Sequence, residues 1–113
     1  TTKARILSLR GVAQHACCPE NNENALALLE QAWTLCPENA HELRLEIGTR
    51  QIAIAFSSVT GENEQVREQQ LGVYFDRMKA QPALFELSDE HSSSCIELFN
   101  FLNEYWEQYI NAS

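Results

Sequence analysis

Turn-forming residues interrupt this chain at four places, and the stretches between them carry apolar residues at spacings of three and four. Such spacing places apolar side chains on one face of an α-helix, and clusters of Pro, Gly and Asn end helices. The sequence therefore predicts an all-α fold. The four breaks are Cys18-Pro19-Glu20-Asn21-Asn22, Pro37, Thr60-Gly61-Glu62-Asn63 and Gln81-Pro82.

The spacing of the breaks predicts about five helices in antiparallel pairs. With 113 residues, the chain has the length of one domain with one core. We expect a single helical domain over residues 1–113. Its parts are a first helix pair at 1–39, a second pair at 40–82, and a linker with a C-terminal helix at 83–113.

The first helix pair is predicted from two apolar faces. One helix covers residues 3–16, and a second runs from Asn24 to Cys36. Asn22 or Asn24 suits the N-cap of the second helix, and Pro37 suits its end. The predicted faces are Ile6, Leu9, Val12, Ala13 and Ala16, and then Ala25, Leu28, Leu29, Ala32 and Trp33.

Residues 41–60 are compatible with two structures. Apolar residues alternate with polar or small ones on both sides of Gly48-Thr49-Arg50, as in a β-hairpin. Wound as a helix, the same residues form two stripes on opposite sides, which suits a helix between two neighbours. Ala53 and Ala55 favour the helix, and a lone hairpin is marginally stable. We predict the helix and keep the hairpin as the alternative. The stripes are Leu43, Ile47 and Ile54, and Leu45, Ile52 and Phe56.

Two further helices are predicted after the break at Gly61. One covers residues 64–80, and the other covers about residues 90–110 after a packed linker with Leu84, Phe85 and Leu87. Ser88-Asp89-Glu90 supplies capping and acidic first-turn residues for the last helix. We interpret that helix as an aromatic cap on the core, and a partner-binding stripe is the alternative. The predicted faces are Val66, Leu71, Tyr74, Phe75 and Met78, and then Cys95, Leu98, Phe99, Leu102, Tyr105, Trp106 and Tyr109.

Charge excludes several classes of partner. The formal net charge is −8, and residues 57–113 carry ten acidic groups against three basic ones. Because nucleic-acid affinity depends largely on Lys and Arg contacts to phosphate, we expect no nucleic acid as a partner, and no anionic membrane. No stretch approaches the roughly 20 apolar residues that cross a bilayer, and the N-terminus lacks a signal-peptide core. We expect a cytoplasmic protein.

Candidate catalytic and metal-binding residues do not form a recognised motif. Ser92-Ser93-Ser94 lies near His91 and Asp89, but in a sequence where capping residues are expected anyway. The His and Cys residues lack a CxxC or HExxH pattern, and no glycine-rich phosphate loop is present. We predict no enzyme, no cofactor and no metal, with mainly structural thiols. The residues considered for zinc or redox chemistry are His15, Cys17, Cys18, Cys36, His41, His91 and Cys95.

The first third of the chain resembles a tetratricopeptide repeat. Aligned on Pro37, residues of the second helix stand where that repeat places small, large and small side chains, and residues of the first helix stand at its other positions. Ala16 departs from the pattern, since the family usually has an aromatic residue there, and Leu9 stands where Trp is typical. A second unit resembles it through Ile52, Ala53 and Phe56, at an offset of 40 residues between Ala13 and Ala53, where the family has about 34. The aligned residues of the first unit are Ala25, Leu29, Ala32, Leu9, Val12, Ala13 and Ala16.

This resemblance implies a protein-interaction module, such as an adaptor, a chaperone-like binder or a regulatory domain. Proteins of that family bind peptide segments in a groove lined by the first helix of each pair. Two arginines facing one groove would bind a protein or peptide partner, such as an acidic segment. The alternative is that Arg10 and Arg50 are ordinary solvated charges paired with nearby Glu. The implied groove residues are Arg10, Gln14, Cys17, Arg50 and Ser57.

Two other functions stay open at this point. A small acidic inhibitor or immunity-type protein would mask a basic target with Glu97, Glu104 and Glu107. A thiol- or metal-dependent protein would use the Cys and His residues named above.

Overall fold

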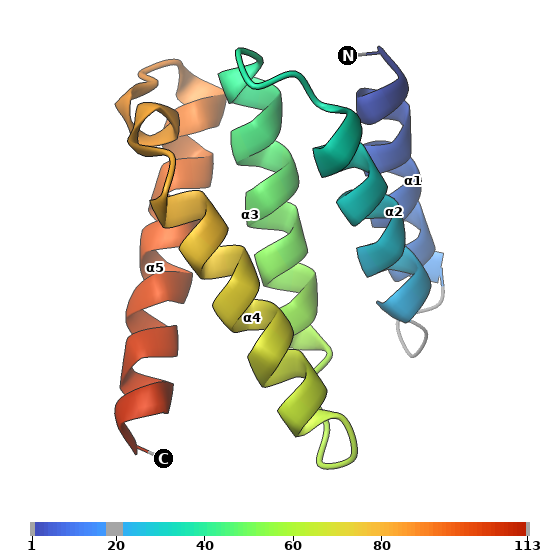
Figure 1. Cartoon of the computed structure of the whole chain (residues 1–113), viewed down its shortest axis with the longest axis vertical. Coiled ribbons are helices and arrows are strands. Elements are labelled where there is room, and N and C mark those ends of the chain that lie inside the picture. The colour runs from blue at the N-terminus through green and yellow to red at the C-terminus, as the bar shows by residue number, and fades with distance from the viewer. Residues whose placement is uncertain (1, 18–21, 113) are drawn as a thin grey trace.

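Five α-helices run alternately in opposite directions, and α3 lies at the centre (Figure 1). The computed structural model describes residues 2–17 and 22–112, so the predicted turn residues 18–21, with Cys18, lie outside the described part. The all-α prediction is confirmed. The elements are α1 (Thr2–Cys17), α2 (Asn22–Leu35), α3 (His41–Ser57), α4 (Glu64–Lys79), the short 3-10 helix η1 (Pro82–Glu86) and α5 (Glu90–Ala112).

The α1 helix packs on α2 through small side chains. A Cβ atom on Gly11 would lie 3.0 Å from Leu29 Cγ and 3.1 Å from the carbonyl oxygen of Ala25, so the two helices approach closely at this point. Small residues on both helices permit such an approach. Four of the five residues of the predicted α2 face are buried, Leu28 is half-buried, and Leu26 is buried in addition. The buried residues of α1 are Ala4, Leu7, Ser8 and Gly11.

The apolar face predicted for the first helix is therefore wrong. Ile6 and Leu9 are 52% and 54% exposed, and Val12, Ala13 and Ala16 are also exposed. Close packing against α2 selects the face of α1 that carries Ala4, Ser8 and Gly11 together with Leu7, and Ile6, Leu9 and Val12 are left on the outer side. The same exposure applies to Leu9, Val12, Ala13 and Ala16, which carry the repeat resemblance in this helix.

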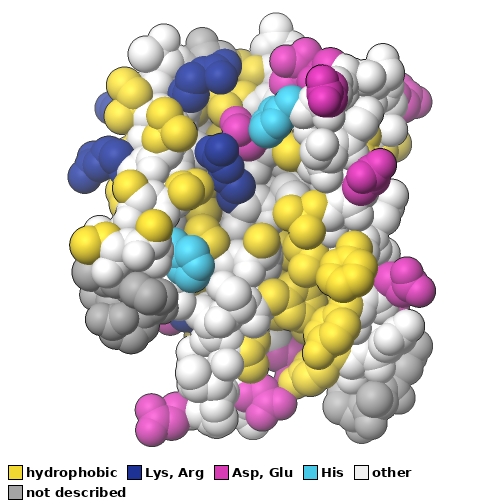
Figure 2. Space-filling view, turned by 180° about the vertical axis from the view of Figure 1, so that it is seen from behind, with side chains coloured by type: hydrophobic (Ala, Val, Ile, Leu, Met, Phe, Trp, Pro, Cys, Tyr) yellow, Lys and Arg dark blue, Asp and Glu magenta, His cyan; other side chains and the backbone are white. Residues whose placement is uncertain are grey.

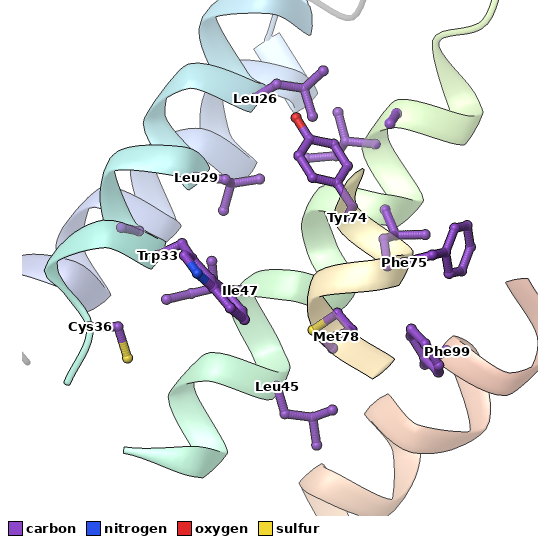
Figure 3. Close-up of a cluster of buried hydrophobic side chains, with 14 of the residues drawn as sticks. Leu26, Leu29, Trp33, Cys36, Leu45, Ile47, Tyr74, Phe75, Met78 and Phe99 are labelled. Carbon is purple, nitrogen blue, oxygen red and sulfur yellow. The ribbon is translucent and has the colours of Figure 1, made fainter. Parts of the chain in front are cut away.

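The α3 helix is buried on two sides, as the two predicted stripes require. Residues 41–57 form one helix, so the hairpin alternative is wrong. Side chains of α2 and α4 meet over Gly48, whose added Cβ would lie 2.2 Å from Met78 Sδ and 3.2 Å from Trp33 Cζ3. Figure 3 shows Trp33, Ile47 and Met78 together in this part of the core. Five of the six predicted stripe residues are buried, and Phe56 is half-buried.

A polar network joins α2, α3 and α4 beside this contact. Gln51 is fully buried, donates to Glu30 Oε1 at 2.9 Å and accepts from Arg77 Nη2 at 2.8 Å. Arg77 Nη1 also pairs with Glu30 Oε2 at 2.9 Å. The guanidinium groups of Arg44 and Arg77 lie over the Trp33 ring at 4.5 and 4.2 Å. The network fixes how the three helices lie relative to one another.

The buried faces of α4 and α5 differ from the predicted apolar faces at a few positions. Val66 is 52% exposed on α4, and Arg67 is buried instead, where it donates to Ser58 Oγ and pairs with Glu23. On α5, Phe99 and Trp106 are buried, whereas Leu98 and Tyr105 are 43% and 57% exposed.

The tight contact at Gly48 predicts a large loss of stability on substitution. Gly48→Val should lower the free energy of unfolding by about 1–3 kcal/mol, because Met78 and Trp33 must move to admit the new side chain. Gly72→Ala is the matched control, since a Cβ there meets nothing within 4 Å, and it should raise the free energy by about 0.5–1 kcal/mol. Urea unfolding measures both, and equal stability of the two variants would contradict the packing.

The contacts of Glu30 predict that the stability of the fold falls at acidic pH. Burial raises its pKa, but hydrogen bonds from Arg77 and Gln51 and the charge of Arg77 outweigh burial, so the pKa is lowered. A lowered carboxyl pKa contributes stability above the unfolded-state pKa, and this contribution is lost as the pH falls through the folded-state pKa. Glu30→Gln should therefore reduce the stability difference between neutral and acidic pH in urea unfolding. Glu62→Gln, at an exposed position, should leave that difference unchanged.

Candidate functional site

Arg50, one of the predicted groove residues, is held by other residues of the chain. Its Nη1 donates to Ser8 Oγ at 3.0 Å, and its Nη2 pairs with Glu46 Oε1 at 2.8 Å. This ion pair agrees with the alternative interpretation, in which Arg50 is an ordinary charge paired with a nearby Glu. Arg50 therefore joins α1 to α3, and a ligand carboxylate would have to compete with Glu46.

The other predicted groove residues do not gather around Arg50. Ser8 of α1 contacts Arg50, and Arg10 follows two residues later, about 200° around the helix. Arg10 is exposed and Gln14 is half-buried on the same helix. Ser57 is exposed and donates to the carbonyl oxygen of Ile54 at 3.0 Å. Cys17 is exposed at the end of α1. The structure therefore does not bring Arg10 and Arg50 into one site.

Glu46 also connects α3 to α5. His91 Nε2 lies 3.1 Å from Glu46 Oε1, and Cys95 Sγ lies 3.9 Å from the same imidazole nitrogen. Burial, and next the charge of Glu46, raise the pKa of the Cys95 thiol, and burial raises that of Cys36. Both thiols are therefore protonated at neutral pH. Within residues 2–17 and 22–112, no group of three or more His, Cys, Asp or Glu side chains is placed to hold a metal ion.

The serine-rich start of α5 serves the helix itself. Asp89 Oδ2 accepts the backbone N–H of Ser92 at 3.0 Å, which is an N-cap contact, as predicted for this segment. Ser94 Oγ donates to the carbonyl oxygen of Glu90 at 3.2 Å. These contacts place Asp89 and Ser94, two residues of the segment that suggested hydrolytic chemistry, in the first turn of α5.

The largest group of exposed aromatic side chains lies on α5, next to the C-terminal half of α3. Phe101 and Tyr105 are 66% and 57% exposed, and Leu98 is 43% exposed. Figure 2 shows hydrophobic side chains gathered on the rear face, on the side of the molecule that holds α3 and α5. We call this surface the α3–α5 face, and define it as Phe56, Leu98, Phe101, Leu102, Tyr105 and Tyr109.

Aromatic rings beneath the α3–α5 face hold it rigid. Phe56 of α3 packs edge to face on Tyr105 at 5.6 Å and on Trp106 at 6.1 Å. Trp106 stacks on Phe75 of α4 at 5.6 Å and on Tyr109 at 5.9 Å. Rings in such contacts lose little freedom when a partner binds, so the surface is already ordered for binding.

A small apolar pocket opens at one end of this face. Its volume is about 130 Å³, enough for one aliphatic side chain, and Leu71 of α4 contributes to its lining. Its other lining residues are Phe56, Val59, Glu68, Tyr105 and Tyr109. The Tyr109 hydroxyl donates to Glu64 Oε1 at 2.6 Å, and this hydrogen bond raises the pKa of Tyr109 to about 12.

Carboxylates surround the α3–α5 face. Glu64 and Glu68 of α4 stand beside the pocket, and Glu97 and Glu104 flank Phe101 at helical spacings of four and three. Glu107 is partly balanced by Lys79, whose Nζ lies 3.5 Å from its Oε1. The face is therefore apolar at its centre and negative at its edge.

The chain matches no protein-family model, and the searches of curated proteins and of solved structures find no match either. None of the described helices combines the length and the apolar character needed to span a membrane.

The helix that carries the face was predicted from the sequence, as an aromatic cap on the core with a partner-binding stripe as the alternative. Leu98 and Tyr105 were predicted to be buried, and Phe101 was not singled out. The available signal was the breadth of the apolar stripe on α5, part of which stays exposed although α5 packs on both α3 and α4.

The hydrogen bond between Tyr109 and Glu64 predicts a titration change. Glu64→Gln should lower the pKa of one tyrosine from about 12 toward its ordinary value near 10, because the carboxylate no longer disfavours the phenolate. Absorbance of tyrosinate against pH measures this shift, and Tyr109→Phe should remove the same transition. Glu62→Gln is the control. If the titration of Glu64→Gln equals that of the unsubstituted protein, the hydrogen bond does not exist in solution.

Proposed function

We propose that this protein is a non-enzymatic protein-interaction module, and that its α3–α5 face binds an apolar segment of another polypeptide. The observation that supports this proposal most directly is the exposure of Phe101 and of Tyr105, whose ring packs on Phe56. Exposed aromatic side chains beside a pocket are the usual anchors of protein interfaces. The tetratricopeptide-like resemblance stays part of this proposal as an indication of the same functional class.

The charge around the face favours a basic partner segment. Arg50 is already paired with Glu46, which argues against the acidic segment expected from Arg10 and Arg50. The carboxylates of Glu64, Glu68, Glu97 and Glu104 would attract Lys and Arg beside an apolar anchor. An apolar side chain of the segment would enter the pocket, and basic side chains would lie over its rim.

The acidic-inhibitor alternative shares this surface. A folded basic target would depend mainly on the exposed Glu97 and Glu104, and its binding would weaken strongly with salt. A short segment would depend mainly on Phe101 and Tyr105 instead.

A random peptide library displayed on phage tests the proposal. Selection on the immobilised protein should enrich peptides that combine an aromatic or aliphatic anchor with Lys or Arg. Phe101→Ser and Tyr105→Ser should each weaken the selected peptides by about tenfold or more, because both remove anchors of the interface.

Val73→Ser is the matched control, since Val73 of α4 is 58% exposed and lies outside the α3–α5 face. It should leave peptide affinity unchanged. Circular dichroism should show equal helix content in all three variants. The proposal fails if the library yields no binder, or if Tyr105→Ser and Phe101→Ser bind the selected peptides as well as the unsubstituted protein does.

A further inference from the structure

The outer side of α1 is an apolar stripe open to solvent. Ile6, Leu9 and Val12 are 52%, 54% and 36% exposed, and Ala13 and Ala16 are exposed beside them. These residues recur at spacings of three and four, so the stripe runs along most of the helix. The inner side of α1 is occupied by the contact with α2 through Gly11. Large exposed apolar patches of this kind mark interaction surfaces.

The charges on α1 and α5 are opposite. The sequence of α1 contains three basic residues, Lys3, Arg5 and Arg10, and no Asp or Glu. The sequence of α5 contains four glutamates, Glu90, Glu97, Glu104 and Glu107, and no Lys or Arg. These two helices therefore carry complementary charge.

Each set of charges lies beside an apolar stripe. Arg5 precedes Leu9 by four residues, and Arg10 follows Ile6 by four, so both arginines flank the α1 stripe. Glu97 and Glu104 flank Phe101 on α5 in the same way. Two helices laid side by side with these stripes in contact would bring arginines next to glutamates.

We infer that α1 of one copy of this chain docks on the α3–α5 face of a second copy. The inference rests on the proposed function, because it uses the same face, and it names the basic apolar segment as α1. The charge complementarity selects this occupant: α1 has the apolar stripe and the basic flanks that the face requires.

The resulting association is head to tail. Figure 1 places α1 and α5 at opposite edges of the molecule, so the α1 stripe and the α3–α5 face are separate surfaces that one copy can use at the same time. A contact between two different surfaces leaves one of each open at the ends, and the assembly grows with concentration. A contact of one helix on one face is small, so the association is reversible.

Sedimentation equilibrium with two complementary variants tests this geometry. Leu9→Asp blocks the α1 stripe, and Phe101→Asp blocks the α3–α5 face. The unsubstituted protein should increase in mean mass with concentration, and each variant alone should stay monomeric. An equimolar mixture should form a one-to-one dimer, because one variant keeps an intact α1 and the other keeps an intact face.

Substitution of exposed residues should not unfold the protein, and circular dichroism checks this. Val73→Asp is the control outside both surfaces and should associate as the unsubstituted protein does. The inference is overturned if the unsubstituted protein stays monomeric at all concentrations, if either variant alone still associates, or if the mixture remains monomeric.

Charge reversal gives a second, independent test. Arg5→Glu with Arg10→Glu, and separately Glu97→Lys with Glu104→Lys, should each weaken self-association by about tenfold or more, as should a rise to high salt. A mixture of the two charge-reversed proteins should associate again, because the reversed α1 meets the reversed face. Absence of this recovery would contradict the pairing of α1 with α5.

The peptide library separates this inference from the proposed function. If selected peptides bind through Phe101 while the chain does not self-associate, the proposed function holds and the inference fails. If neither binding is observed, both fail. A third outcome is that the library yields no binder while the chain self-associates and the mixture of Leu9→Asp and Phe101→Asp forms a dimer. In that case α1 occupies the face, and the broader peptide-binding role fails.

Discussion

The arrangement of the helices depends on the close contact of α2 and α4 over Gly48. Only a residue without a side chain leaves room at this position for Trp33 and Met78 together. The guanidinium groups of Arg44 and Arg77 lie over the Trp33 ring, and Arg77 joins the buried Gln51 to Glu30. Packing and polar contacts thus meet at one point and hold α2, α3 and α4 in a single arrangement.

The burial of α3 on two sides has a consequence at the edges of the molecule. Its apolar stripes pack against α2 on one side and against α4 and α5 on the other. Of its polar residues, Glu46 and Arg50 are half-buried and Ser57 is exposed. The helices form two layers, with α2 and α4 in front of α1, α3 and α5 (Figure 1), and among the described residues the outer sides of α1 and α5 have no neighbouring helix. The exposed apolar residues of α1 and α5 lie at the two ends of this arrangement.

The two ends differ in charge and in the type of apolar side chain. The α5 end has aromatic rings supported by Phe75 and Trp106, with a pocket and a rim of carboxylates. The α1 end has aliphatic side chains with basic flanks. A rigid acidic aromatic surface suits recognition of a basic apolar segment, whereas the polar contacts of His91, Cys95 and Glu46 hold α3 and α5 together.

The amino-acid sequence by itself predicted the order and approximate limits of the helices, because Pro and Gly breaks and helical periodicity act locally, but it left a hairpin open at residues 41–60, where the structure has α3. It also determined the two-sided burial of α3, since a helix buried on two sides must carry apolar residues on both. Only the tertiary structure decided which side of α1 is buried. Ala4, Ser8 and Gly11 are weakly hydrophobic, yet they allow the closest approach to α2, and this outweighs the larger burial that Ile6 and Leu9 would offer. The tertiary structure also decided that Arg10 lies apart from Arg50 and that Phe101 and Tyr105 are exposed. Each depends on the rotation of a helix about its own axis, and contacts between residues far apart in the chain set that rotation.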